Sequence, residues 1–179
     1  MSSQVEPFAA LLDIARRSVS NAQGLPAQVD IKPHWSGIGF KLAGHHFVAP
    51  MGEVVEILAQ PPSTRLPGVQ SWVRGVANVR GRLLPLIDLE SFFGGSLSGK
   101  KSRRVLALEL GDLYSGLIVN EVFGMQHFPV DSFSDQVPVA LDALKPFLAG
   151  SYQLNEITWS VFSPFKLAQN ADFFNAAAS

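Results

Sequence analysis

The strongest constraint on the fold comes from the stretch between Trp72 and Gly95, which reads WVRGVANVRGRLLPLIDLESFFGG. It begins with strict alternation, in which small apolar residues take every second position at Val73, Gly75, Ala77 and Val79. The positions between them carry two guanidiniums and an amide around one valine, at Arg74, Val76, Asn78 and Arg80. Such period-two alternation predicts a β-strand. We expect its apolar face in a tightly curved core and its polar face on a recognition surface.

A turn, a second strand and a short helix are expected after this strand. Gly81 breaks the first strand, and residues 83–89 read as a buried strand. Pro85 predicts an edge position or a bulge within it, because proline cannot donate to a β-ladder. Asp88 is a suitable N-cap for one helical turn over residues 89–93, which the next two glycines end. The stretch therefore predicts a hairpin that leads directly into a capped helical turn.

The rest of the chain predicts an all-β fold apart from its two ends and short turns. Alternation with frequent turn signals extends from Trp35 to Phe162 and gives about nine or ten short strands. A strand within MGEVVEIL places Val54 and Glu56 on one face. Further core positions are expected at even spacing on one later strand, at Leu117, Val119 and Phe123.

The N-terminal segment differs in its periodicity. Apolar side chains recur at three- and four-residue spacing from Glu6 to Asn21, which predicts an amphipathic helix. A linker containing glycine and proline follows, so we expect the helix to be peripheral to the β fold. Two roles stay open for it, packing on its own domain or docking a partner. The expected organisation is a helix and linker at 1–33, a β domain at 34–167 and a tail at 168–179.

Composition narrows the classes of protein and partner. The chain is 47% hydrophobic and 16% charged, which is typical of a globular protein. Its formal net charge of −1 favours neither nucleic acid nor an anionic membrane as a partner. It has no cysteine, which excludes disulfides and thiol chemistry. Without a signal peptide or an apolar run of roughly 20 residues, we expect a soluble, cytoplasmic protein.

No pattern in the sequence predicts catalysis, a metal or a cofactor. The serines lack a nucleophile motif, the acidic residues are scattered, and no phosphate-binding loop is present. The adjacent His45 and His46 would point to opposite faces of a strand, so they are not expected to share a metal. The basic run Lys100 to Arg104 lies on an expected turn and is interpreted as a solvated loop. We therefore expect a protein that is not an enzyme and holds no cofactor.

The central stretch resembles the signature of CheW-like adaptor domains, whose centre reads roughly hRGhhNhRGphhPhhDLpphhG, with h apolar and p polar. The matching positions are Arg74, Gly75, Asn78, Arg80, Gly81, Pro85, Asp88, Leu89 and Gly94. The likeness extends over residues 35–165, where HHFVAPMGEVVEIL and YSGLIVNEVFG are similar to further elements of the family. Asn120 departs from that pattern, because the family has an aspartate there. Both ends of the chain look more like the PilI-type adaptors of type IV pilus (twitching) chemosensory systems.

The resemblance implies two intertwined five-stranded SH3-like barrels. It also implies a non-catalytic adaptor that links a chemoreceptor to a CheA-type histidine kinase and is recruited to membrane-associated receptor arrays. By the same resemblance, Val76, Asn78 and Arg80 would bind the receptor. Val54, Glu56 and Gly75 would lie near the kinase-facing surface.

Two alternatives stay open at this point. Small β-barrels serve many roles, so the chain could instead be a ligand-binding or nucleic-acid-binding module. Arg80 could also pair with a local carboxylate and simply close the barrel.

Overall fold

The computed structural model describes residues 11–12, 14–17, 32–96, 102–137 and 142–176. Contacts within the chain define two compact units, residues 1–32 and residues 33–179. In the first unit the described residues 11–12 and 14–17 are helical and exposed. The remainder of the predicted helix Glu6 to Asn21, like Lys100 and Lys101 of the basic run, lies outside the described residues.

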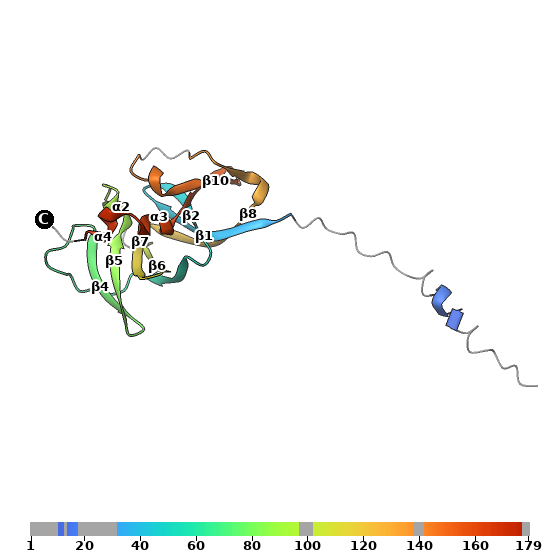
Figure 1. The fold of residues 1–179 in the computed structure, drawn as a ribbon, viewed down its shortest axis with the longest axis horizontal. Helices are drawn as coiled ribbons and strands as arrows, with labels where there is room; N and C mark the ends of the chain where they lie inside the picture. The colour runs from blue at the N-terminus through green and yellow to red at the C-terminus, as the bar shows by residue number, and fades with distance from the viewer. Residues whose placement is uncertain (1–10, 13, 18–31, 97–101, 138–141, 177–179) are drawn as a thin grey trace, which may run out of the picture. The chain divides into compact units, whose positions relative to one another are not determined.

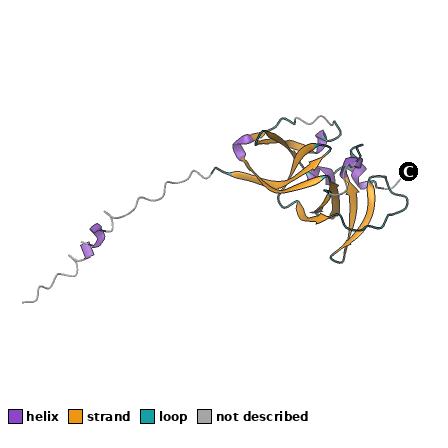
Figure 2. Ribbon diagram, turned by 180° about the vertical axis from the view of Figure 1, so that it is seen from behind, coloured by secondary structure: helices purple, strands orange, loops and turns teal. Residues whose placement is uncertain are grey.

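The second unit consists of two β-sheets and a few short helices (Figures 1 and 2). A six-stranded sheet has the order β8-β1-β2-β11-β10-β9, and a five-stranded sheet has the order β3-β6-β7-β5-β4. The first sheet is built from β1 (His34–Leu42), β2 (His45–Pro50), β8 (Glu121–Pro129), β9 (Phe133–Ser134), β10 (Leu148–Leu154) and β11 (Ile157–Phe162). The second is built from β3 (Val54–Ala59), β4 (Val73–Val79), β5 (Arg82–Asp88), β6 (Arg104–Leu110) and β7 (Leu113–Val119).

The chain passes from the first sheet to the second and back again. β1 and β2 open the six-stranded sheet, β3 to β7 form the whole of the other, and β8 to β11 complete the first. Each sheet contains one pair of parallel strands, β2 with β11 in the first and β5 with β7 in the second. The other neighbouring strands are antiparallel. The predicted intertwined arrangement is therefore confirmed, with the two-residue β9 as an additional strand. Within the described residues there are eleven strands, slightly more than predicted.

Three apolar clusters hold this arrangement together. The largest is formed by residues of both sheets and the C-terminal helices, with Phe40, Leu106 and Phe162 each at most 1% exposed. A second fills the five-stranded sheet around Leu84 and Ile118. A third, around residues such as Phe128, Tyr152 and Trp159, fills the six-stranded sheet. The alternation of β4 follows from this packing, because Gly75 and Ala77 face inward.

Short helices lie beside the junction of the sheets. In Figure 1, α2 (Leu89–Phe92), α3 (Pro164–Ala168) and α4 (Ala171–Phe174) gather between β10 on one side and β4 and β5 on the other. An aromatic contact joins α2 to α4, since the rings of Phe92 and Phe173 lie 5.6 Å apart. Phe173 is 5% exposed, so part of the segment predicted as a C-terminal tail belongs to the core.

Three expectations about individual residues are wrong. Pro85, expected at an edge or a bulge, lies in an inner strand and pairs regularly with Val76. The β5–β7 ladder begins one residue later at Leu86, so no ladder bond is lost there. Leu83, expected in a buried strand, is 70% exposed. Phe123 is 37% exposed, because the chain changes sheet at Asn120 and the alternation of β7 does not continue into β8.

Candidate functional site

The β4–β5 hairpin carries the side chains predicted to bind the receptor. Arg80 and Gly81 form a two-residue turn, with φ angles of 53° and 81°, between the paired residues Val79 and Arg82. Positive φ at both positions is the geometry of the tight hairpin turn that matches the twist of the strands. The side-chain oxygen of Asn78 accepts a hydrogen bond of 2.9 Å from the Gly81 N–H. Asn78 therefore fixes the turn, and Arg80 projects from the turn and not from the strand.

Arg80 reaches across to β3 and pairs with Glu56. Its terminal nitrogen Nη2 lies 2.6 Å from Oε1 of Glu56, and the two side chains are 79% and 25% exposed. The structure thus brings together one residue predicted for the receptor surface and one predicted for the kinase surface. It also shows the local carboxylate partner that had stayed open as an alternative for Arg80.

The two other residues predicted for the kinase surface lie deeper. Val54 is partly buried against the largest apolar cluster. Gly75 is buried at a β-bulge with φ of 135°, and a Cβ atom there would lie 2.2 Å from the carbonyl oxygen of Thr64. The backbone of Thr64 forms two hydrogen bonds of 2.9 Å with Val76, along the outer edge of β4. Gly75 is therefore needed for the close approach of this segment.

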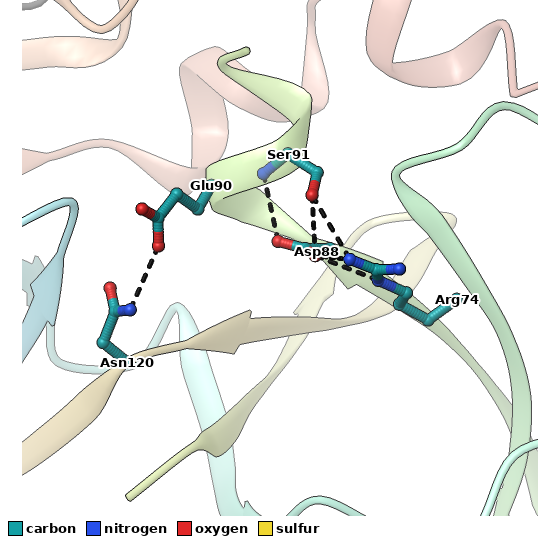
Figure 3. A network of polar contacts seen from close by, with 5 residues as sticks. All are labelled: Arg74, Asp88, Glu90, Ser91 and Asn120. Carbon is teal, nitrogen blue, oxygen red and sulfur yellow. Dashed lines mark hydrogen bonds and ion pairs between the residues drawn. The ribbon is translucent and has the colours of Figure 1, made fainter. Parts of the chain in front are cut away.

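Arg74 does not belong to an open recognition surface, contrary to expectation. Figure 3 shows its guanidinium against Asp88, which is fully buried. Nε of Arg74 donates to Oδ2 of Asp88 at 2.9 Å, and Nη2 pairs with the same oxygen. Asp88 also accepts from the backbone N–H and the hydroxyl of Ser91, at 3.0 Å and 2.7 Å. The predicted N-cap is confirmed, and the same carboxylate ties α2 to β4.

Asn120 makes a second polar connection, also seen in Figure 3. Its side-chain oxygen accepts from the Ala43 N–H at 3.1 Å, and its Nδ2 donates to Oε2 of Glu90 at 3.0 Å. Asn120 therefore links the β1–β2 turn of one sheet to α2 beside the other. An aspartate at this position would face the Glu90 carboxylate without a donor, which gives a physical reason for the departure from the family pattern.

Leu83 adds an exposed apolar side chain that sequence reasoning missed. It lies directly opposite Asn78, and Pro85 lies opposite Val76, so these four residues share the outer face of the hairpin. The sequence gives no signal for this exposure, because Leu83 begins an unbroken apolar run from which no face can be read. The recognition strip, as we define it, comprises Val76, Asn78, Leu83 and Pro85, with Arg80 at its end.

Near the turn, a separate contact covers the opposite face of the hairpin. Arg82 pairs with Glu109 at 3.0 Å, and its guanidinium carbon lies 3.9 Å from the ring centre of Tyr114. The hydrogen bond from Arg82 lowers the pKa of the Glu109 carboxyl. Arg82 pairs across the ladder with Val79, so it faces away from the recognition strip.

The described part of the chain contains no cluster of three or more histidine, aspartate or glutamate side chains that could hold a metal. Over the same residues, no helix is long and apolar enough to cross a bilayer. The arrangement presents exposed apolar, amide and guanidinium groups on one hairpin, which suits recognition of another protein.

Comparison with known proteins agrees with this interpretation. A model of the CheW-like domain matches residues 36–172. The chain is 55% identical over 178 residues to Protein PilI of Pseudomonas aeruginosa, and the match covers 99% of both chains. It is 28% identical over 146 residues to Protein FrzA of Myxococcus xanthus, covering 78% of this chain and 89% of the relative.

A solved structure supports the fold. The scaffolding protein TtCheW of Thermoanaerobacter tengcongensis superposes with a TM-score of 0.64 at 24% identity. The superposition covers 73% of this chain and 89% of TtCheW. The sequence resemblance is thus confirmed over most of the chain, and its PilI-type character by the match to the Pseudomonas protein. The chain belongs to the family of CheW-like domains.

Proposed function

We propose that this protein is a non-catalytic adaptor that couples a chemoreceptor to a CheA-type histidine kinase in a twitching-motility pathway. The observation that carries the proposal is the match to Protein PilI over 99% of both chains, together with the CheW-like domain at residues 36–172. Binding to a receptor would recruit the chain to membrane-associated receptor arrays.

The receptor is proposed to bind the recognition strip on the β4–β5 hairpin. Leu83 is 70% exposed, and an exposed leucine between an amide and a guanidinium provides an apolar anchor with polar groups at its rim. Asn78 contributes mainly by holding the turn, since its side-chain oxygen is already used by Gly81. Arg80 supplies the charge at the end of the strip.

The kinase is proposed to bind at β3, an edge strand of the five-stranded sheet. Glu56 carries the charge on one face of this strand, and Val55 and Ile57 on its other face are 50% and 40% exposed. Val54, which packs against the largest apolar cluster, supports this strand, whereas Gly75 lies on β4 and would act by holding the Thr64 segment. An exposed apolar edge strand is otherwise an aggregation hazard, which is consistent with its being covered by a partner.

The experiment compares Arg80→Glu with Arg82→Glu in pull-downs with the receptor and, separately, with the kinase. Both arginines are exposed and both pair with a glutamate, but they face opposite sides of the hairpin. We expect Arg80→Glu to weaken receptor binding about 10- to 100-fold, as loss of a charge-assisted contact predicts. Arg82→Glu should leave binding unchanged. If the two variants bind the receptor equally well, the recognition strip is excluded as the receptor site.

A further inference from the structure

We propose that a cavity beside α2 receives the side chain of a lysine from a partner protein. The cavity has a volume of about 140 Å³. Glu90 stands in its wall, and the other lining residues are Leu42, Ala43, Phe93, Gly94, Gly95 and Leu144. Leu42 and Leu144 are buried, whereas Gly94 and Gly95 are exposed, so the cavity can be reached from the surface of the protein.

Glu90 supplies the charged group in the cavity wall that a ligand would contact. Its side chain is buried, with 9% of the residue exposed, and Oε2 accepts a single hydrogen bond from Asn120. The amide of Asn120 is held in this orientation, because its oxygen accepts from the Ala43 N–H. No residue in the described part of the chain donates to Oε1. Oε1 is therefore open to a donor from outside the chain, and a cation placed in the cavity would form a charge-assisted hydrogen bond with it.

The shape and chemistry of the cavity fit the side chain of lysine better than that of arginine. Its wall is apolar apart from Glu90, which suits a side chain with an apolar stem and a compact charged end. A cavity of about 150 Å³ holds a benzene molecule of six heavy atoms. The lysine side chain has five heavy atoms beyond Cα, whereas the arginine side chain has seven and a wide planar end.

The test titrates the full chain with small ligands while the backbone amide signals of Gly94 and Gly95 are followed by NMR. The probes are n-butylamine, Nα-acetyl-lysine N-methylamide, 1-butanol and propylguanidine. The protein variants are Glu90→Gln, which keeps an oxygen for the Asn120 hydrogen bond, and Glu109→Gln as a matched control outside the cavity. The dispersion of the same spectra shows whether each variant is folded.

We expect both amines to shift the two glycine signals saturably at millimolar concentration. Binding should weaken at least 10-fold for 1-butanol and for the Glu90→Gln variant, and stay unchanged in Glu109→Gln. Equal binding of 1-butanol, or no effect of Glu90→Gln, would show that charge is not recognised and would overturn the proposal. Tighter binding of propylguanidine would assign the cavity to arginine instead.

One further variant tests whether the lysine that occupies the cavity comes from a partner or from this chain. Lys100 and Lys101 follow Gly95 closely in the sequence. If the amines bind only after both are changed to Ser, the occupant is a lysine of this chain and the assignment to a partner is wrong. The test uses the protein alone, so its failure would leave the proposed adaptor function unaffected.

Discussion

Replacing Arg74 with Met should destabilise the fold far more than the same replacement at Arg82. Both arginines pair with a carboxylate, but Asp88 is fully buried whereas Glu109 is exposed. In Arg74→Met the Asp88 carboxylate keeps only its two donors from Ser91. Because the Asp88 side chain is 0% exposed, its carboxylate is poorly hydrated once its charged partner is removed.

The expected loss can be estimated from this geometry. Removing one partner of a fully buried ion pair costs about 3–5 kcal/mol. The Arg74 side chain is 36% exposed, so solvent screens part of the interaction. We therefore expect a loss of about 2–3 kcal/mol in the free energy of unfolding. For a chain of this size, that corresponds to a melting temperature lower by roughly 4–12 °C.

The assay is urea unfolding followed by tryptophan fluorescence, with thermal melting as a second measurement. Arg82→Met serves as the control, since it also removes an arginine from the hairpin while leaving Asp88 paired. A much smaller change is expected there, because the pair that it breaks is exposed to solvent. Equal losses in the two variants would refute the argument that burial of Asp88 sets the cost.

Four further predictions address the strip, the sheet junction, pH and the N-terminal segment. Leu83→Ser should leave the urea midpoint unchanged or higher and weaken receptor binding by roughly 10-fold or more, measured by pull-down. Asn120→Asp should lower the melting temperature at pH 7 by placing two carboxylates together, and adding Glu90→Gln should recover the loss. Burial lowers the pKa of His46 in the folded chain, so below about pH 6.5 the unfolded chain binds more protons and stability falls as the pH drops. His46→Gln should therefore flatten the dependence of unfolding free energy on pH between about 7 and 5. Deleting residues 1–30 should preserve cooperative unfolding of the β domain, and loss of cooperativity would show that this segment is part of its core.

Local patterns in the sequence were enough to predict the parts of the fold that depend on neighbouring residues. The strand over residues 73–79 follows from its alternation, because a period of two directly encodes which face is buried. The N-cap at Asp88 likewise depends only on a residue three positions away. The family motif then supplied the arrangement of the sheets, which no local pattern contains.

Contacts between distant residues account for what could not be predicted. The partners of Arg74 and Arg80 lie 14 and 24 positions away, so neither ion pair is visible in the alternation that places both arginines together. Of the predicted site residues, the structure joins Arg80 to Glu56 but buries Gly75. The assignment of these residues to the receptor or to the kinase stays a prediction.

The most direct test of the adaptor function is a three-component binding measurement. Receptor is immobilised, and retention of the histidine kinase is measured with and without this protein at equal concentrations. We predict that the kinase is retained only when this protein is present, and that Arg80→Glu strongly lowers its retention while Arg82→Glu does not. Kinase retained equally well without this protein, or no binding of this protein to either partner, would contradict the proposed coupling.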